Sequence, residues 1–159
     1  MKFIDISQSK KNIYTLQANE QCVFYMLNRN GKITFELAGE NAEAHIFAFF
    51  IGKKNGKGKL SITQKHIAPR TISHAIIKSV LFDESEYAYT GLITINKQAK
   101  QSDASQESRT LLLSPLATVL VKPALEVFAD DVKCRHAVTV SRLNQETLFF
   151  AQSRGLSKA

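Results

Sequence analysis

A cysteine and a histidine lie two residues apart in the C-terminal part of the sequence, as Cys134 and His136, shortly after the acidic pair Asp130 and Asp131. Side chains alternate between the faces of an extended strand, so residues two apart project from the same face. A thiolate beside an imidazole could bind a soft metal ion or an iron–sulfur cluster, but two ligands do not complete a site. Spacing alone favours a plainer alternative, in which Cys134 packs as a small apolar residue and His136 is a hydrogen-bonded strand histidine.

Other residues with chemical potential are scattered. His45, His66 and His74 follow no ligand spacing, and structural roles are expected for them. Cys22 precedes an apolar segment and is expected in the core. The Asp130–Asp131 pair follows an alanine in a turn-like segment, where such residues usually bond to their own backbone.

Motifs of nucleotide binding and nucleophilic catalysis are missing from the sequence. The lysine-rich segment GKKNGKGK has one residue too few between Gly52 and Gly56–Lys57 for a phosphate-binding loop, and it has Gly58 where such a loop needs Ser or Thr. A G-x-S-x-G sequence does not occur either. The chain is therefore predicted not to be an enzyme.

Size and composition fit one globular domain. The chain has 159 residues, of which 44% are hydrophobic and 22% charged, which allows a sizeable core. The net charge of +7 lies entirely in residues 1–80, whereas residues 81–159 are neutral. Much of the basic charge belongs to the lysine-rich segment, which we expect to be an exposed loop. The charge suggests nucleic-acid binding only weakly, because a basic surface interleaved with aromatic residues is missing.

The sequence also indicates where in the cell the protein is located. Its apolar runs are far shorter than the ~18–20 residues that span a bilayer, and the N-terminus does not resemble a signal peptide. Two cysteines without a secretion signal are expected to be free thiols in a reducing cytosol. We therefore expect a cytoplasmic protein without a membrane or nucleic-acid partner.

Alternating apolar and polar residues predict strands through nearly the whole chain. The expected strands cover residues 22–27, 32–37, 44–51, 59–63, 71–82, 87–95, 110–113, 118–122 and 132–140. One helix is expected near the end, capped by Asn144, with Glu146 in its first turn and Gly155 at its C′ position. This pattern alone allows a sandwich or a parallel β-helix, since a repeat of ~20–30 residues is not visible.

Three segments carry a family resemblance. They are KHIAPRTISHAIIKSVLFDESEYAYTGLITI (residues 65–95), AKQSDASQESRTLLLS (99–114) and LLLSPLATVLVKPALEVFADDVKCRHAVTVSRLNQETLFFAQSRG (111–155). In this order they resemble the core of the SufB/SufD proteins, scaffold subunits of the SUF machinery for iron–sulfur cluster assembly. The resemblance covers about residues 20–157. Members with SufB character carry a cysteine on the strand that leads to Pro123, which this chain lacks, while Cys134-Arg135-His136 is similar to the Cys-x-His of SufD.

The resemblance implies a fold and a role. The expected fold is all-β, a right-handed parallel β-helix over residues 1–143, with residues 144–159 starting a shortened C-terminal helical region. The expected role is a non-catalytic scaffold or partner subunit without a stably bound cofactor. The SufD histidine that corresponds to His136 faces a SufB cysteine across the interface where a transient iron–sulfur cluster forms. His136 is thus the first candidate ligand of the metal or cluster, and Cys134 the second.

The partners implied are a SufB-like subunit or a second copy of this chain, paired through the strand at residues 132–140, and a SufC-like ATPase in the complex. Relatives continue beyond the point where this sequence ends, into a helical domain that docks SufC, which weighs against direct docking here. The family glycine after the histidine is Ala137, where an added methyl group would alter a close contact. The alternative function is a degenerate β-helix protein that dimerises without building clusters.

Overall fold

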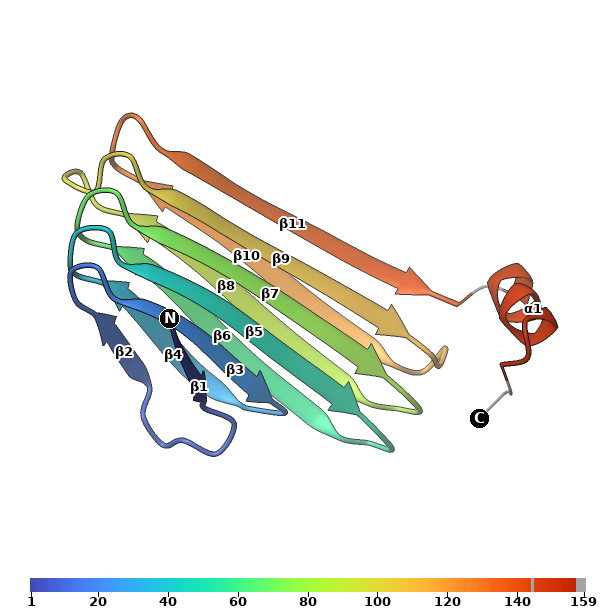
Figure 1. Ribbon diagram of the computed structural model, residues 1–159. Coiled ribbons are helices and arrows are strands. Elements are labelled where there is room, and N and C mark those ends of the chain that lie inside the picture. The colour runs from blue at the N-terminus through green and yellow to red at the C-terminus, as the bar shows by residue number, and fades with distance from the viewer. Residues whose placement is uncertain (144, 157–159) are drawn as a thin grey trace.

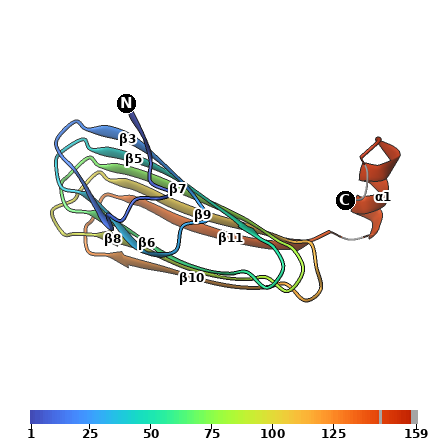
Figure 2. The same ribbon diagram turned by 90° about the horizontal axis from the view of Figure 1, so that it is seen from below.

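The chain winds into two facing parallel sheets followed by one short helix, as the computed structural model shows for residues 1–143 and 145–156 (Figure 1). Successive strands alternate between the sheets, which form two layers when seen from below (Figure 2). Sheet A consists of β1 (Lys2–Asp5), β3 (Gln21–Leu27), β5 (Glu43–Gly52), β7 (Ile72–Leu81), β9 (Asp103–Leu112) and β11 (Lys133–Arg142). Sheet B consists of β2 (Ile13–Leu16), β4 (Gly31–Leu37), β6 (Lys57–His66), β8 (Glu86–Ile95) and β10 (Thr118–Val127). The predicted all-β, parallel β-helix is confirmed.

One coil of the β-helix runs from a residue of sheet A to the residue aligned with it on the next strand of that sheet. The number of residues in a coil changes along the chain. Gln21 aligns with Glu43, and Glu43 aligns in turn with Ile72, so the second of these coils is longer than the first. The next coil, from Ile72 to the aligned Asp103, is longer again. Because the spacing drifts, the coils do not produce a fixed sequence period, which explains why the repeat is invisible in the sequence.

Corner residues with positive φ fix the register of sheet A. One such residue lies two positions before each strand from β3 onward, namely Asn19, Asn41, Arg70, Gln101 and Asp131. Backbone hydrogen bonds join neighbouring corners. The N–H of Arg70 donates to the carbonyl of Lys100 (2.8 Å), and the N–H of Gln101 donates to the carbonyl of Asp131 (2.8 Å). Asp131 therefore forms the last corner, in agreement with the predicted turn.

Several strand boundaries differ from the prediction. The short strands β1 and β2 were not predicted, and β9 begins at Asp103 rather than at residue 110. The start of β9 has no apolar alternation because its inward side chains Gln106 and Ser108 are polar and buried. β10 continues through Pro123 to Val127, which is possible because β10 is an edge strand and a proline there removes no essential donor.

The loop between β1 and β2, residues 6–12, is fixed by hydrogen bonds from Arg29. This side chain is only 7% exposed, and its guanidinium donates to the carbonyls of Ile6, Ser9 and Lys11 and to the side chain of Asn12. Its cationic donors satisfy several buried oxygens at once, so one residue fixes the whole loop.

We expect Arg29→Met to lower the free energy of unfolding by about 2–4 kcal/mol, because the loop carbonyls lose their donors while the site stays buried. Urea unfolding measures the change. The control is Arg109→Met, which removes an exposed arginine that pairs with Glu107 and is expected to change stability by less than about 1 kcal/mol. Equal effects of the two substitutions would contradict the role of Arg29.

The helix α1 (Gln145–Ser153) lies beyond the end of β11 and apart from the two sheets (Figures 1 and 2). Gly155, with φ of 89°, ends it at the predicted C′ position, and its N–H donates to the carbonyl of Gln152 (3.0 Å). The predicted cap, Asn144, is outside the described residues. Among the described residues, no helix has both the length and the apolar character needed to cross a membrane.

Candidate functional site

Cys134 and His136 share one face of β11, as their spacing predicts, and this face is the inward one. Cys134 is aligned with Ala104 of β9 and His136 with Gln106, and both of these β9 side chains are buried between the sheets. Lys133, Arg135 and Ala137 alternate with them and face outward. The two candidate ligands therefore belong to the interior of the β-helix rather than to its outer wall.

This interior is open at the last coil. In sheet B, Ile95 is 0% exposed, whereas Val127, which is aligned with it on β10, is 41% exposed. In sheet A, Thr110 is 2% exposed, whereas the aligned Val140 on β11 is 47% exposed. β10 and β11 are the terminal strands of their sheets, so their inward side chains have neighbours on one side only. Cys134 and His136 lie at this open end.

The two candidate ligands differ in burial and in their proton affinity. Cys134 is half-buried and packs against a small apolar cluster that includes Ile93 and Ile95, whereas His136 is exposed. Burial, together with the negative charge of Asp103, raises the pKa of the Cys134 thiol above its ordinary value. The thiol is therefore protonated at neutral pH and has to lose a proton before it can bind a metal. His136 is the more accessible ligand.

A buried hydrogen-bond network ends beside His136. Nδ1 and Nε2 of His66 lie 2.7 Å from the hydroxyls of Thr71 and Ser73, and Nε2 of Gln64 donates to the Ser73 hydroxyl (2.6 Å). Nε2 of Gln106 in turn donates to Oε1 of Gln64 (3.0 Å). The network thus fixes Gln106, the side chain directly aligned with His136.

Gly91 makes room for Gln106 in the opposite sheet. A Cβ atom at this glycine would overlap Oε1 of Gln106, at a separation shorter than any van der Waals contact. A residue with a side chain would therefore displace Gln106 from the interior.

The sequence prediction missed Gln64, Ser73 and Gln106 as part of this site. The local sequence gives no signal for them, because residues 105–110 are all polar, which usually indicates a solvent-exposed face. Only the pairing of β6, β7 and β9 across two sheets shows that these side chains meet inside.

The remaining candidates have structural positions. His66 is fully buried in the network, and Cys22 is buried in the core, as predicted for both. His66 and His74 lie on different strands, β6 and β7. His45 and His74 lie side by side on the outer face of sheet A. Among the described residues, no group of three or more His, Cys, Asp or Glu side chains is arranged to hold a metal ion.

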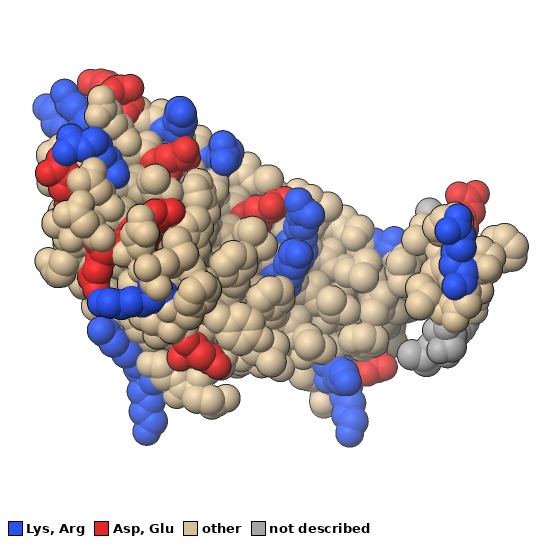
Figure 3. Space-filling model, in the orientation of Figure 1, with Lys and Arg blue, Asp and Glu red and all other residues tan. Residues whose placement is uncertain are grey.

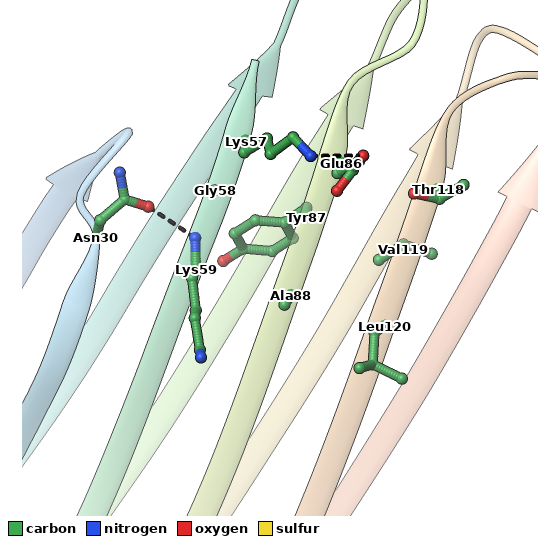
Figure 4. A pocket seen from close by; sticks show the side chains of 10 residues that line it. All are labelled: Asn30, Lys57, Gly58, Lys59, Glu86, Tyr87, Ala88, Thr118, Val119 and Leu120. Carbon is green, nitrogen blue, oxygen red and sulfur yellow. Dashed lines mark hydrogen bonds and ion pairs between the residues drawn. The ribbon is translucent and has the colours of Figure 1, made fainter. Parts of the chain in front are cut away.

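Two shallow pockets differ in their position relative to the site. One, with a volume of about 440 Å³, lies across β7, β9 and β11 and is lined by His74, Ser105, Arg135 and His136, among others. The other, of about 450 Å³, lies where β6, β8 and β10 begin (Figure 4). Its charged lining is an ion pair between Lys57 and Glu86 (3.1 Å) beside Lys59, whose N–H donates to Asn30 (2.7 Å). It combines no nucleophile with a base, and it belongs to sheet B rather than to the sheet of Cys134 and His136.

Comparison with known proteins gives consistent matches. Residues 17–159 match the family described as "SUF system FeS cluster assembly, SufBD core domain". The chain is 32% identical over 123 residues to the iron–sulfur cluster assembly protein SufD of Escherichia coli, covering 77% of this chain and 29% of that protein. It is 42% identical over 89 residues to the chloroplastic protein ABCI7 of Arabidopsis thaliana, covering 55% of this chain and 19% of that protein. The chain thus spans less than a third of the length of these relatives.

Proposed function

The chain belongs to the SUF-system iron–sulfur assembly family through its SufBD core domain, and we propose that it serves there as a non-catalytic partner subunit that presents His136 to a nascent cluster. The partner is a SufB-like subunit or a second copy of the chain. The cluster is the cargo of such a complex, not a resident cofactor.

The observation that carries this proposal is the position of His136 on the inward face of the last, open coil. A second subunit that continues the two sheets would cover this coil and bring its own side chains next to His136. Because the chain contributes one imidazole and one thiol there, additional ligands from the second subunit are needed to hold a cluster. An imidazole is an accepted cluster ligand, and the open end supplies one without a half-buried, protonated thiol having to ionise first.

The proposal is tested by anaerobic reconstitution with iron and sulfide in the presence of a SufB-like subunit. We expect His136→Ala to lower the yield of assembled cluster by at least about tenfold, the loss that even an outer-shell partner of a metal ligand produces. Cys134→Ala is expected to have a smaller effect, because this thiol is half-buried and protonated. Absorbance and Mössbauer spectra measure the cluster, while circular dichroism and partner pull-down check folding and association.

The alternative is a protein of the same fold that pairs without building clusters. The alanine at position 137, in place of the family glycine, is the feature that favours it. If His136→Ala and the parent chain assemble equal amounts of cluster in the presence of the partner, this alternative replaces the proposed role.

We further propose that the chain does not turn over nucleotides by itself, since its lysine-rich segment lacks the spacing of a phosphate loop and its lysines are exposed. We expect ATP hydrolysis by the purified chain to stay at the level of the buffer. Turnover that is abolished by Lys57→Ala would contradict this expectation.

A further inference from the structure

Two histidines form a pair on the outer face of sheet A, away from the open end. His45 of β5 is aligned with His74 of β7, and their ring centroids are 5.5 Å apart with an angle of 39° between the planes. Both side chains project from the outer wall, whereas His136 faces the interior two strands further on. The pair therefore lies on the other face of the sheet from the proposed cluster site, although His74 and His136 border one shallow pocket.

Each imidazole of this pair is held through one ring nitrogen. Nε2 of His45 lies 2.6 Å from Oε1 of Glu43, and Nδ1 of His74 lies 2.6 Å from the hydroxyl of Ser105. Metal-binding histidines in proteins show this arrangement, in which an oxygen partner fixes one nitrogen and leaves the other for the ion. Glu43 is itself fixed, because its other oxygen accepts a hydrogen bond from Gln21 (3.0 Å).

The spacing of the rings suits a shared ion. Two imidazoles that bind one ion at nitrogen–metal distances of ~2.0–2.1 Å have centroids on the order of 5 Å apart, close to the observed separation. Burial lowers the pKa of His74, an effect that Asp103 opposes and His45 assists, so this imidazole is neutral at pH 7, the form that binds metals.

The surroundings of the pair are mixed, with Glu43 in contact with His45 and Arg135 lining the same shallow pocket as His74. Figure 3 shows this face of the molecule, on which acidic and basic side chains are interspersed among uncharged ones. The next outward residues along β5 and β7 are Phe47 and Ile76, which are aligned with each other. These apolar side chains exclude water from one side of the pair and strengthen the interaction of the imidazoles with a cation. The side chain of His45 keeps 26% of its surface exposed, so an ion can reach it.

We propose that His45 and His74 together bind a divalent transition-metal ion on the outer face of sheet A, with Glu43 and Ser105 orienting the two rings. Nδ1 of His45 and Nε2 of His74 are the ligand atoms, and water completes the coordination. Imidazole ligands select for ions such as Zn²⁺, Ni²⁺ and Cu²⁺ over Mg²⁺ and Ca²⁺. This site is independent of the proposed cluster function.

The test uses the full, untagged chain and Ni²⁺, which is paramagnetic and does not oxidise the two thiols. We expect Ni²⁺ to broaden the ring signals of His45 and His74 in ¹⁵N-detected imidazole spectra at lower concentration than those of His66 and His136. In isothermal titration calorimetry, His45→Gln and His74→Gln should each weaken binding at this site at least tenfold. Glu43→Gln should weaken it by about tenfold, as expected for a residue that orients a ligand.

Arg109→Gln is the control, because it changes an exposed, outward-facing residue of sheet A outside the pair and should leave this binding event unchanged. Ni²⁺ affinity that survives both His45→Gln and His74→Gln would overturn the proposal. Equal broadening of all four histidines in the parent chain would do the same, and this measurement does not depend on whether a variant folds.

Discussion

Val138→Pro is expected to abolish the association of this chain with the proposed partner subunit while the fold is retained. The N–H of Lys133 donates to the carbonyl of Ser102 (2.9 Å), so this residue and every second residue after it direct their backbone groups toward β9. Val138 belongs to the other set, whose backbone groups point to the free edge. A proline there removes a donor from the edge without removing a bond to β9.

The expected loss is large because the open end combines two driving forces for association. The free edges of β10 and β11 present unpaired backbone groups that another strand can bond, as in other cases of strand addition. The inward side chains Leu125, Val127, Val138 and Val140 are exposed apolar groups that a second coil would bury. Size-exclusion chromatography with light scattering, with and without a SufB-like subunit, measures the association.

A matched control separates edge pairing from contact with the outer wall. Thr139 faces outward from β11, so Thr139→Lys should leave the association intact, whereas Val140→Lys should weaken it by placing a charge in the covered interior. Association that persists in Val138→Pro, or a parent chain that stays monomeric with and without the partner, would rule out this interface.

Local pattern was sufficient to predict most strands but not their stacking. Alternation around Ile33 and Ile62, for example, predicted strands that the structure confirms in β4 and β6. Whether these strands form a sandwich or a β-helix depends on which strands pair, and the lengthening of the coils along the chain hides that pairing from the sequence. The family resemblance supplied what the periodicity could not.

The candidate site was predicted in part for the same reason. The two-residue spacing of Cys134 and His136 correctly placed them on one face of a strand. It could not show that this face is the inward one, nor that the coil is the last and therefore open. Gln106 and the histidine pair of the outer wall depend on alignment between strands that belong to different coils, which no local pattern records.

Acidification is expected to destabilise the protein through His66. Burial lowers the pKa of this histidine from 6.5 to about 4, an effect that Asp103 opposes and His74 assists. Between these two values the unfolded chain binds a proton that the folded chain does not, so the free energy of unfolding falls as the pH falls from 6.5 to about 4. The shift corresponds to about 3 kcal/mol, an order-of-magnitude figure.

The effect is isolated by comparing the parent with His66→Gln, because carboxylates that titrate in the same range contribute equally to both. A glutamine can still bond to Thr71 or Ser73 but does not gain a proton. The difference in stability between the two proteins should therefore shrink by about 3 kcal/mol between pH 7 and pH 4, as measured by urea unfolding. If His66→Gln shows the same pH dependence of stability as the parent, His66 is not the group that titrates. The buried network that fixes Gln106 beside His136 would then be insensitive to acid.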